Sequence, residues 1–348
     1  MHLAVGGHPL HTRALAVTLT HRADGRLDLD SYVLDVRKRG FVPVGGDLQG
    51  PGIIHHMLLC GTVDPMARTI DSVTATQPNV AFEPCALSGG ESCRDPVGRI
   101  TGLNGTRFDE AYGPRLGAIF GGPRGCSHLL TLGHLVGSTV PWALTHDAEL
   151  LGRSVERIAG ERVFRRDLIL DGHETDDGGM HLGVQLTDLH LAPAPAISAP
   201  MQRFAAELEV RALLTVDLAT YTLREARIGE RRRALADLER AAWHDRSDAV
   251  QQLVGLPLMQ GFTAEVLRRY GAATDDRPLT DVLLMIGPTL IQCTAALSEQ
   301  WSVQAKGSAS LVGMSGLPDS CYMWRRDGAL DRARGADDPL SAKAQRRR

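Results

Sequence analysis

The sequence predicts an α+β fold with two tandem copies of a four-stranded antiparallel sheet. Each copy carries helices on one face, and the copies are related by a pseudo-twofold axis. Four strand-like segments precede a run of helical segments, an order typical of helices packed on an antiparallel sheet. The same order recurs when the chain is compared with itself at a shift of about 153 residues. Hydrophobic residues make up 43% of the 348 residues, which is enough for substantial cores.

A β-hairpin is expected at the start of the chain. Residues 11–21 (HTRALAVTLTH) and 26–36 (RLDLDSYVLDV) alternate apolar and polar side chains, the pattern of half-buried strands. The intervening Ala23-Asp24-Gly25 is typical of a three-residue hairpin loop. Counting outward from this loop places Arg13 opposite Asp35, in phase with the apolar face. We interpret the two as a cross-strand ion pair that specifies register, with a catalytic role as the alternative.

Two more strands and three helical segments complete the first half. The strands are expected at 53–64 and 68–76, after a loop rich in glycine and proline at 39–52. Because successive strand residues face opposite ways, His55 and His56 cannot share an environment. Helical segments are expected near 94–103 and 107–117, followed by a longer helix within Gly121–Leu144.

The start of that longer helix is expected to carry chemistry. Leu132 and Leu135 follow His128 at helical spacing, so His128 should face the core. A helix N-terminus concentrates unpaired N–H groups and partial positive charge. This environment should lower the pKa of Cys126 and make its thiolate available. The alternative interpretation is a buried cysteine beside a hydrogen-bonded core histidine.

The internal repeat predicts the domain organisation. Residues 1–150 form the first copy, 151–300 a second and degenerate copy, and 301–348 a C-terminal segment with a basic tail. Arg13 and Asp35 recur as Arg166 and Asp188, which favours a role in the fold. The second copy has no Cys or His at the positions of four reactive residues of the first: His11, His55, Cys126 and His128. The site is therefore predicted in the first copy.

Several motifs of the first copy resemble a bacterial family of unknown function, the DUF2889 proteins. They are HTR at 11–13, His55 with Met57, TVD at 62–64 and GCSHL at 125–129, and Cys85 stands as a plausible lone cysteine. The family's closing segment resembles DSCYMWRRDG at 319–328. Three positions depart from the family pattern, which has Asp, Arg and His where this chain has His56, Cys60 and Tyr322. The resemblance implies kinship but no established activity.

The candidate catalytic residues are His11, Arg13, His55, Cys126 and His128. Histidines exchange protons near neutral pH, Arg13 would hold a carboxylate or oxyanion, and the turn at Gly125 would add N–H donors. This set favours an enzyme of small-molecule catabolism, a carbon–carbon lyase on an aromatic or hydroxylated substrate, with isomerase or hydrolase chemistry also open.

Two alternatives to a cofactor-free enzyme remain. The same histidines with Cys126 are suitable ligands for zinc or iron, so a metal-dependent hydrolase or lyase is the first. The second is a non-catalytic binding or scaffold protein built from two packed sheets. No GxGxxG follows a strand and no GxxxxGK[ST] occurs, so a nucleotide cofactor is not supported.

Charge and cysteine usage narrow the expected partners. The net charge of −3 gives no reason to expect nucleic-acid binding. The most apolar helix, near 282–297, is broken by Gly287 and Pro288, so no membrane span is expected. No signal pattern is seen, and the six cysteines contain no CxxC pair, which favours reduced thiols in the cytoplasm. A small-molecule substrate and a homodimer are compatible with these features.

Overall fold

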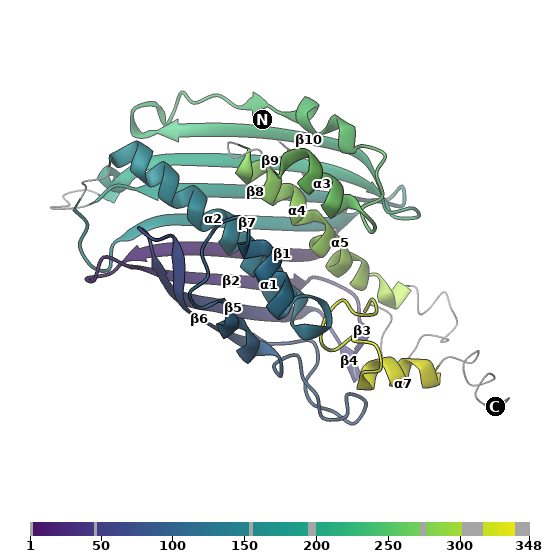
Figure 1. Cartoon of the computed structure of the whole chain (residues 1–348). Coiled ribbons are helices and arrows are strands. Elements are labelled where there is room, and N and C mark those ends of the chain that lie inside the picture. Colours follow the sequence, from purple (N-terminus) through teal and green to yellow (C-terminus); the bar gives the residue numbers. More distant parts are fainter. Residues whose placement is uncertain are drawn as a thin grey trace.

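One large antiparallel sheet organises the protein (Figure 1). The computed structural model describes residues 3–44, 47–152, 156–193, 200–271, 276–300 and 316–337. Nine strands in these ranges follow the order β11-β10-β9-β8-β7-β1-β2-β5-β6. Their bounds are β1 His8–His21, β2 Leu27–Arg37, β5 Gly52–Asp64, β6 Thr69–Asn79, β7 Arg162–Glu174, β8 Gly179–Leu191, β9 Phe204–Asp217, β10 Thr222–Ala234 and β11 His244–Asp245.

The predicted first hairpin and its register are confirmed. β1 pairs with β2 so that Arg13 lies opposite Asp35. The loop closes with a hydrogen bond from Arg22 N to Arg26 O at 2.9 Å, and Gly25 has a φ of +79°, a conformation that glycine adopts without steric cost. The apolar phase of β1, including Leu15 and Leu19, is fully buried, as alternation requires.

The prediction of two separate four-stranded sheets is wrong. β1 and β7 pair antiparallel from the His8–Glu174 end to the Thr20–Arg162 end, so the strands of both halves form one sheet. A strand edge left open would expose a row of unpaired backbone groups, and joining the halves edge to edge satisfies them. Sequence periodicity shows which face of a strand is buried but not which edge finds a partner, so this junction was not visible.

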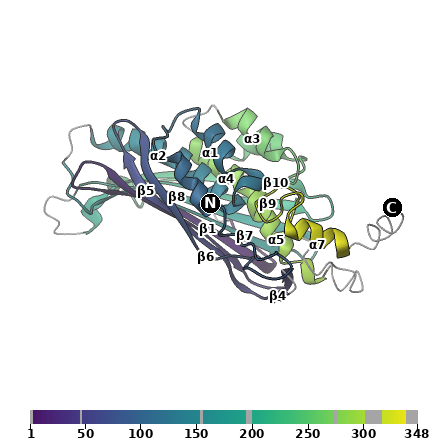
Figure 2. The same cartoon turned by 60° about the horizontal axis from the view of Figure 1, so that its bottom comes forward.

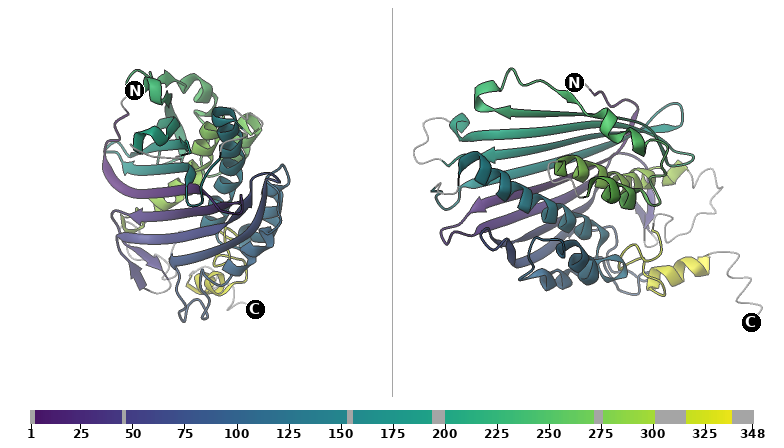
Figure 3. Two further views of the ribbon diagram at one scale, coloured as in Figure 1. Left: turned by 90° about the vertical axis from the view of Figure 1, so that its left-hand side faces the viewer. Right: turned by 45° about the horizontal axis from the view of Figure 1, so that its top comes forward.

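The helices cover a single face of the sheet, as the predicted fold class requires (Figures 2 and 3). Their bounds are α1 Tyr112–Phe120, α2 Ser127–Leu151, α3 Phe262–Tyr270, α4 Arg277–Leu284 and α5 Ile286–Ala295. The segment expected to be helical near 94–103 is a 3₁₀ helix at Val97–Leu103. Leu129, Leu132 and Val136 of α2 are fully buried, which confirms the periodicity that predicted this helix.

The most apolar helical stretch belongs to the core. Residues 277–295 are long and apolar enough to cross a membrane by length and composition alone, but 72% of that window is buried inside the protein. In the structure the stretch is divided into α4 and α5, which pack on β1, β7 and β8. Its apolar character is explained by contact with the sheet.

The C-terminal segment packs beside the first half. Residues 316–328 lead into α7 (Ala329–Asp337) near the small hairpin of β3 (Val42–Val44) and β4 (Asp47–Gln49) (Figure 1). Met323, Trp324 and Leu330 form a small separate core with Phe82. The predicted basic tail, Arg346–Arg348, lies outside the described residues.

Candidate functional site

Asp35 of β2 lies at the centre of a buried polar cluster. Its carboxylate is fully buried. Arg13 donates to it through Nε at 2.8 Å and Nη2 at 2.9 Å, a bidentate pair. Nε2 of His11 lies 2.9 Å from Oδ1 of Asp35. The β1–β2 register produces this grouping, because Arg13 stands opposite Asp35 and His11 lies on the same face two residues earlier.

A strand irregularity brings His55 into the cluster. β5 pairs with β2 so that His55 lies opposite Asp35, while the next pair joins Val36 to Ile53, which leaves Ile54 as an extra residue. Such a bulge re-aims side chains, and here Ile54 and His55 are both buried. Nδ1 of His55 lies 3.3 Å from Oδ2 of Asp35. It is buried without a hydrogen-bond partner among the described residues.

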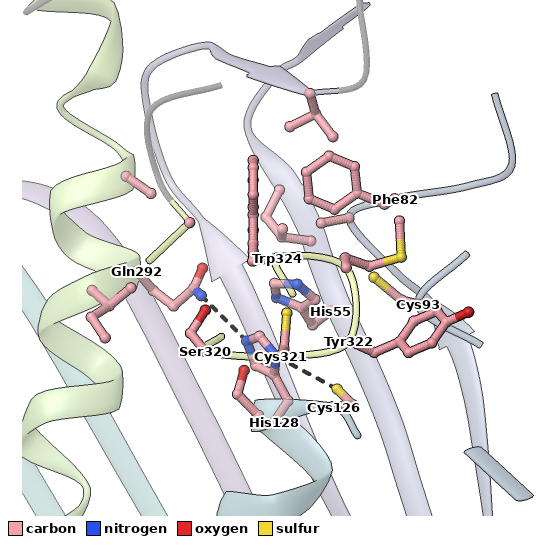
Figure 4. Close-up of a pocket in the computed structure, with 18 of the residues that line it drawn as sticks. His55, Phe82, Cys93, Cys126, His128, Gln292, Ser320, Cys321, Tyr322 and Trp324 are labelled. Atoms are coloured by element: carbon pink, nitrogen blue, oxygen red, sulfur yellow. Dashed lines mark hydrogen bonds between the residues drawn. The ribbon is translucent and has the colours of Figure 1, made fainter. Parts of the chain in front are cut away.

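His128 reaches the same carboxylate from the start of α2. The turn before the helix needs glycine, since a Cβ on Gly125 would lie 2.2 Å from the carbonyl oxygen of Phe120. The first turn of α2 then places Nε2 of His128 3.3 Å from Oδ2 of Asp35. The ring centroids of His55 and His128 are 3.8 Å apart. Nε2 of Gln292 from α5 lies 3.2 Å from Nε2 of His128 (Figure 4).

A cavity of about 160 Å³ opens beside the two imidazoles. Three parts of the chain form its wall. The first half contributes His55 and His128, α5 contributes Gln292, and the C-terminal segment contributes Tyr322 and Trp324. The amide of Tyr322 donates to the carbonyl of Gly125 at 2.8 Å, so the C-terminal segment is tied to the turn that starts α2. Figure 4 shows these side chains around the cavity.

Arg37 also lines the cavity. It lies two residues after Asp35 on the same face of β2 and is 3% exposed. Nη1 donates to the carbonyl of Gln49 at 2.8 Å and Nη2 to its side-chain oxygen at 3.2 Å. Burial lowers the pKa of Arg37 to about 10, so the side chain is cationic at neutral pH.

Burial and neighbouring charge favour an ionised Asp35 and neutral His11 and His128. Burial alone would raise the pKa of Asp35, but Arg13, His11 and His55 hold it well below its usual value. Burial lowers the pKa of His11 despite its contact with Asp35. Burial, with His55 beside it, also places the pKa of His128 well below its usual value. An ionised Asp and neutral imidazoles are the forms that bind metal ions.

The first half matches a known family. Residues 11–140 match the model of a family described as "Protein of unknown function (DUF2889)". This stretch is similar to that family. It runs from β1 into α2 and contains all five predicted site residues. No curated protein and no solved structure matches the chain.

Four of the five predicted residues meet around Asp35 within the DUF2889 stretch. His11, Arg13, His55 and His128 all lie within 3.3 Å of its carboxylate oxygens. The guanidinium of Arg13 donates to both carboxylate oxygens of Asp35, and the side chain is only 2% exposed. Asp35 itself was predicted only as an ion-pair partner, because its central position depends on His55 and His128, which arrive from distant segments.

Cys126 lies beside the cluster in a different chemical state from the predicted one. Its Sγ lies 3.9 Å from Nδ1 of His128 and 3.5 Å from the sulfur of Met57. The expectation of a lowered pKa is wrong, because burial raises the pKa of this thiol to about 12. The desolvation penalty on a thiolate outweighs the N–H groups of the helix start.

Residues outside the DUF2889 stretch escaped the sequence analysis. Gln292 belongs to no motif and lies in the half predicted to lack a site. Trp324 lies in a motif that resembles the family but was not named as a site residue. The closing segment at 319–328 was a usable signal for this part of the cavity wall. It resembles the family and contributes Tyr322 and Trp324 to the wall. Arg37 lies within the DUF2889 stretch and was also missed, although its position two residues after Asp35 places its side chain on the buried face of the strand.

Proposed function

We propose that this protein is a metal-dependent enzyme acting on a small molecule, with Asp35, His55 and His128 as ligands of zinc or iron. The observation that carries the proposal is the convergence of one ligand atom from each of these three residues. All three atoms lie within 4.8 Å of one another. Two imidazoles and one carboxylate are an established ligand set for catalytic zinc and for non-haem iron.

The distances within the triad fit a metal better than hydrogen bonds. Both imidazole nitrogens lie 3.3 Å from Oδ2 of Asp35, beyond the usual range for an N–H···O bond. With metal–ligand bonds of about 2.0 Å, neighbouring ligands of a tetrahedral centre stand roughly 3.3 Å apart. Nδ1 of His55 is also buried without a hydrogen bond among the described residues. A metal ion would satisfy this lone pair.

The surroundings of the triad suit catalysis. Arg13 and His11 contact Oδ1 of Asp35 and orient its carboxylate. Metal ligands are commonly oriented by such outer hydrogen-bond partners. Three protein ligands leave a coordination position open, which is the arrangement of catalytic sites. The cavity beside His55 and His128 provides access to that position. Activation of a bound water or polarisation of a substrate carbonyl would support hydrolase or lyase chemistry.

Acid–base catalysis without a metal is a second candidate. The specific observation in its favour is the contact of His11 with Asp35 at 2.9 Å, a base held by a carboxylate, beside His55 on the cavity. A lyase acting on an aromatic or hydroxylated substrate would suit this arrangement. Metal content separates the two candidates directly.

We further propose that the two halves arose by an ancestral duplication and that only the first half kept the site. Its support is the strand order, in which β1-β2-β5-β6 and β7-β8-β9-β10 extend in opposite directions from the β1–β7 pair, as a pseudo-twofold axis would require. Arg166 and Asp188 repeat the buried Arg13–Asp35 pair at matching register. Buried Phe164 and Leu208 stand at the positions of His11 and His55. Residues 1–150 and 151–300 would then be the two copies. We place the activity on a small molecule in the cytoplasm.

The test is metal analysis of the purified protein, before and after reconstitution with zinc or ferrous iron. We expect about one equivalent in the wild type and at most about a tenth in His55→Ala and His128→Ala. His190→Ala is the matched control, because His190 is also buried but lies in the second half, and it should keep the metal. His55→Gln covers the case in which alanine disturbs folding, which thermal melting would reveal.

Two results would overturn the proposed metal centre. A folded wild-type protein that binds less than about a tenth of an equivalent after reconstitution has no such centre. Retention of stoichiometric metal by folded His55→Gln and His128→Ala would equally remove these residues as ligands.

A further inference from the structure

We infer that the cavity binds a small monocyclic carboxylate, with Arg37 as the group that holds the carboxylate. This inference rests on the proposed function in treating the cavity as the substrate pocket. It adds a substrate class and a binding residue that neither the family motifs nor the triad supplies.

Arg37 is a buried cation without an anionic partner in the described part of the chain. No Asp or Glu of the described residues lies within 4.0 Å of its guanidinium, unlike the buried Arg13 and Arg166. Its two described acceptors belong to Gln49, and both are neutral. Its Nε is buried and has no hydrogen-bond partner in these ranges. An isolated buried charge is costly, and a ligand carboxylate would remove that cost through a bidentate pair.

The charge around the cavity also favours an anion. No Asp or Glu is among the described residues that line it. Asp35 lies behind the imidazoles and is neutralised by Arg13. Arg37 therefore leaves one net positive charge beside the cavity before any metal is counted, and a divalent ion would increase the excess. An anionic substrate balances charge that the protein leaves open.

The size and the wall of the cavity favour one ring. Its volume is about 160 Å³, and cavities of roughly 150 Å³ accommodate benzene. Met57, Phe82 and Trp324 line it, with the rings of Phe82 and Trp324 edge to face at a centroid distance of 5.4 Å. Such a wall binds the faces and edges of an apolar ring.

The positions of Arg37 and the triad set the orientation of the ligand. Asp35 and Arg37 occupy the same face of β2, two residues and so about 7 Å apart. A ring whose carboxylate is held by Arg37 can therefore extend toward His55 and His128. The group that reacts is then a substituent on the part of the ring remote from the carboxylate.

Calorimetric titration with benzoate, benzamide and cyclohexanecarboxylate tests this assignment on the full chain. We expect wild type to bind benzoate at least about tenfold more tightly than benzamide, because only the acid pairs with Arg37. Arg37→Gln should lose about tenfold or more in benzoate affinity, and Arg37→Lys should lose less. Arg39→Gln is the matched control, since Arg39 pairs with Glu174 and is absent from the cavity wall.

The outcomes separate this inference from the metal proposal. Benzoate binding that survives chelation and is weakened in Arg37→Gln but not in Arg39→Gln supports the carboxylate pocket even when no metal is found. Equal affinity for benzoate and benzamide, equal affinity in wild type and folded Arg37→Gln, or no benzoate binding in the metal-loaded protein would overturn it. Tight binding of cyclohexanecarboxylate supports the carboxylate anchor and shows that an apolar ring suffices.

Discussion

At the scale of single residues, the same buried Arg–Asp pair occurs in two different settings. Asp35 is joined by imidazoles, whereas the corresponding region of the second half supplies another carboxylate. Arg166 contacts both Asp188 and Asp281, and Ser138 donates to Asp281 at 2.8 Å. One buried cation thus faces two acids, so one of the acids carries an uncompensated charge when both are ionised. Burial raises the pKa of Asp281 to about 6 despite the attraction of Arg166.

Asp281→Asn should therefore change how stability depends on pH. Because the folded-state pKa of Asp281 lies above its ordinary value of 3.8, the folded state holds the proton more tightly than the unfolded state. The stabilisation is complete below pH 3.8 and is lost as pH rises through 6. A shift of this size corresponds to a free energy on the order of 3 kcal/mol.

Chemical denaturation at several pH values measures the effect. We expect the variant to gain stability relative to wild type between about pH 4 and 7. Asp167→Asn is a suitable control, because Asp167 is a half-exposed partner of Arg165. A constant difference between Asp281→Asn and wild type across this range would contradict the assigned protonation of Asp281.

Contacts between residues could be predicted from the sequence where the two residues lie close together along the chain. Arg13 and Asp35 are joined by one hairpin whose loop fixes the register, so counting along the sequence was enough. Gln292 reaches His128 across 164 residues of chain, and no pattern near either residue reports that distance. The prediction of a lowered pKa for Cys126 was wrong for a related reason, because the depth at which the thiol is buried depends on the tertiary structure.

At the scale of elements, α1 and α2 are held together by glycines that leave room for large side chains. A Cβ on Gly137 of α2 would lie 2.2 Å from a ring carbon of Tyr112 in α1. The hydroxyl of Tyr112 in turn donates to the carbonyl of Gly133 at 2.9 Å. This contact fixes α1 against α2, the helix whose first turn carries His128.

Gly137→Ala should destabilise the protein by about 1–3 kcal/mol, the range for overpacking a closely packed interface. Gly117→Ala in α1 is the matched control. A Cβ there meets no atom of the described residues within 4 Å. The better helix propensity of alanine should therefore leave stability unchanged or raise it by up to about 1 kcal/mol. Urea denaturation midpoints compare the two. Equal effects of both substitutions would show that packing against Tyr112 does not hold the helices.

The elements themselves were largely predictable, because their signals lie within each segment. The four strands of the first half and the start of α2 followed from periodicity and turn residues. Val97–Leu103 departs from the expected helix by forming a 3₁₀ segment with no acidic first turn and no side-chain cap. The identity of the strand beside β1 depends on an edge-to-edge contact, which periodicity does not encode.

At the scale of the whole molecule, the continuous sheet makes the two halves depend on each other. β1 pairs with β2 on one side and with β7 on the other. The cavity likewise needs α5 and the C-terminal segment in addition to the first half. The DUF2889 stretch therefore supplies the triad, and residues beyond it complete the wall around the cavity.

Residues 1–152 produced alone should fail to form a stable monomer. Separation from β7 leaves the β1 edge open, with unpaired N–H and C=O groups that recruit another strand. It also exposes apolar side chains of α2 that pack on the second half. We expect insoluble or self-associated material from this fragment, measured by size-exclusion chromatography with light scattering. Coexpressed as separate chains, residues 1–152 and 156–348 should copurify in equal amounts, because β7 of the second fragment would pair again with β1 of the first. A monodisperse, cooperatively melting monomer of 1–152 would contradict this dependence and would make the first half an independent domain.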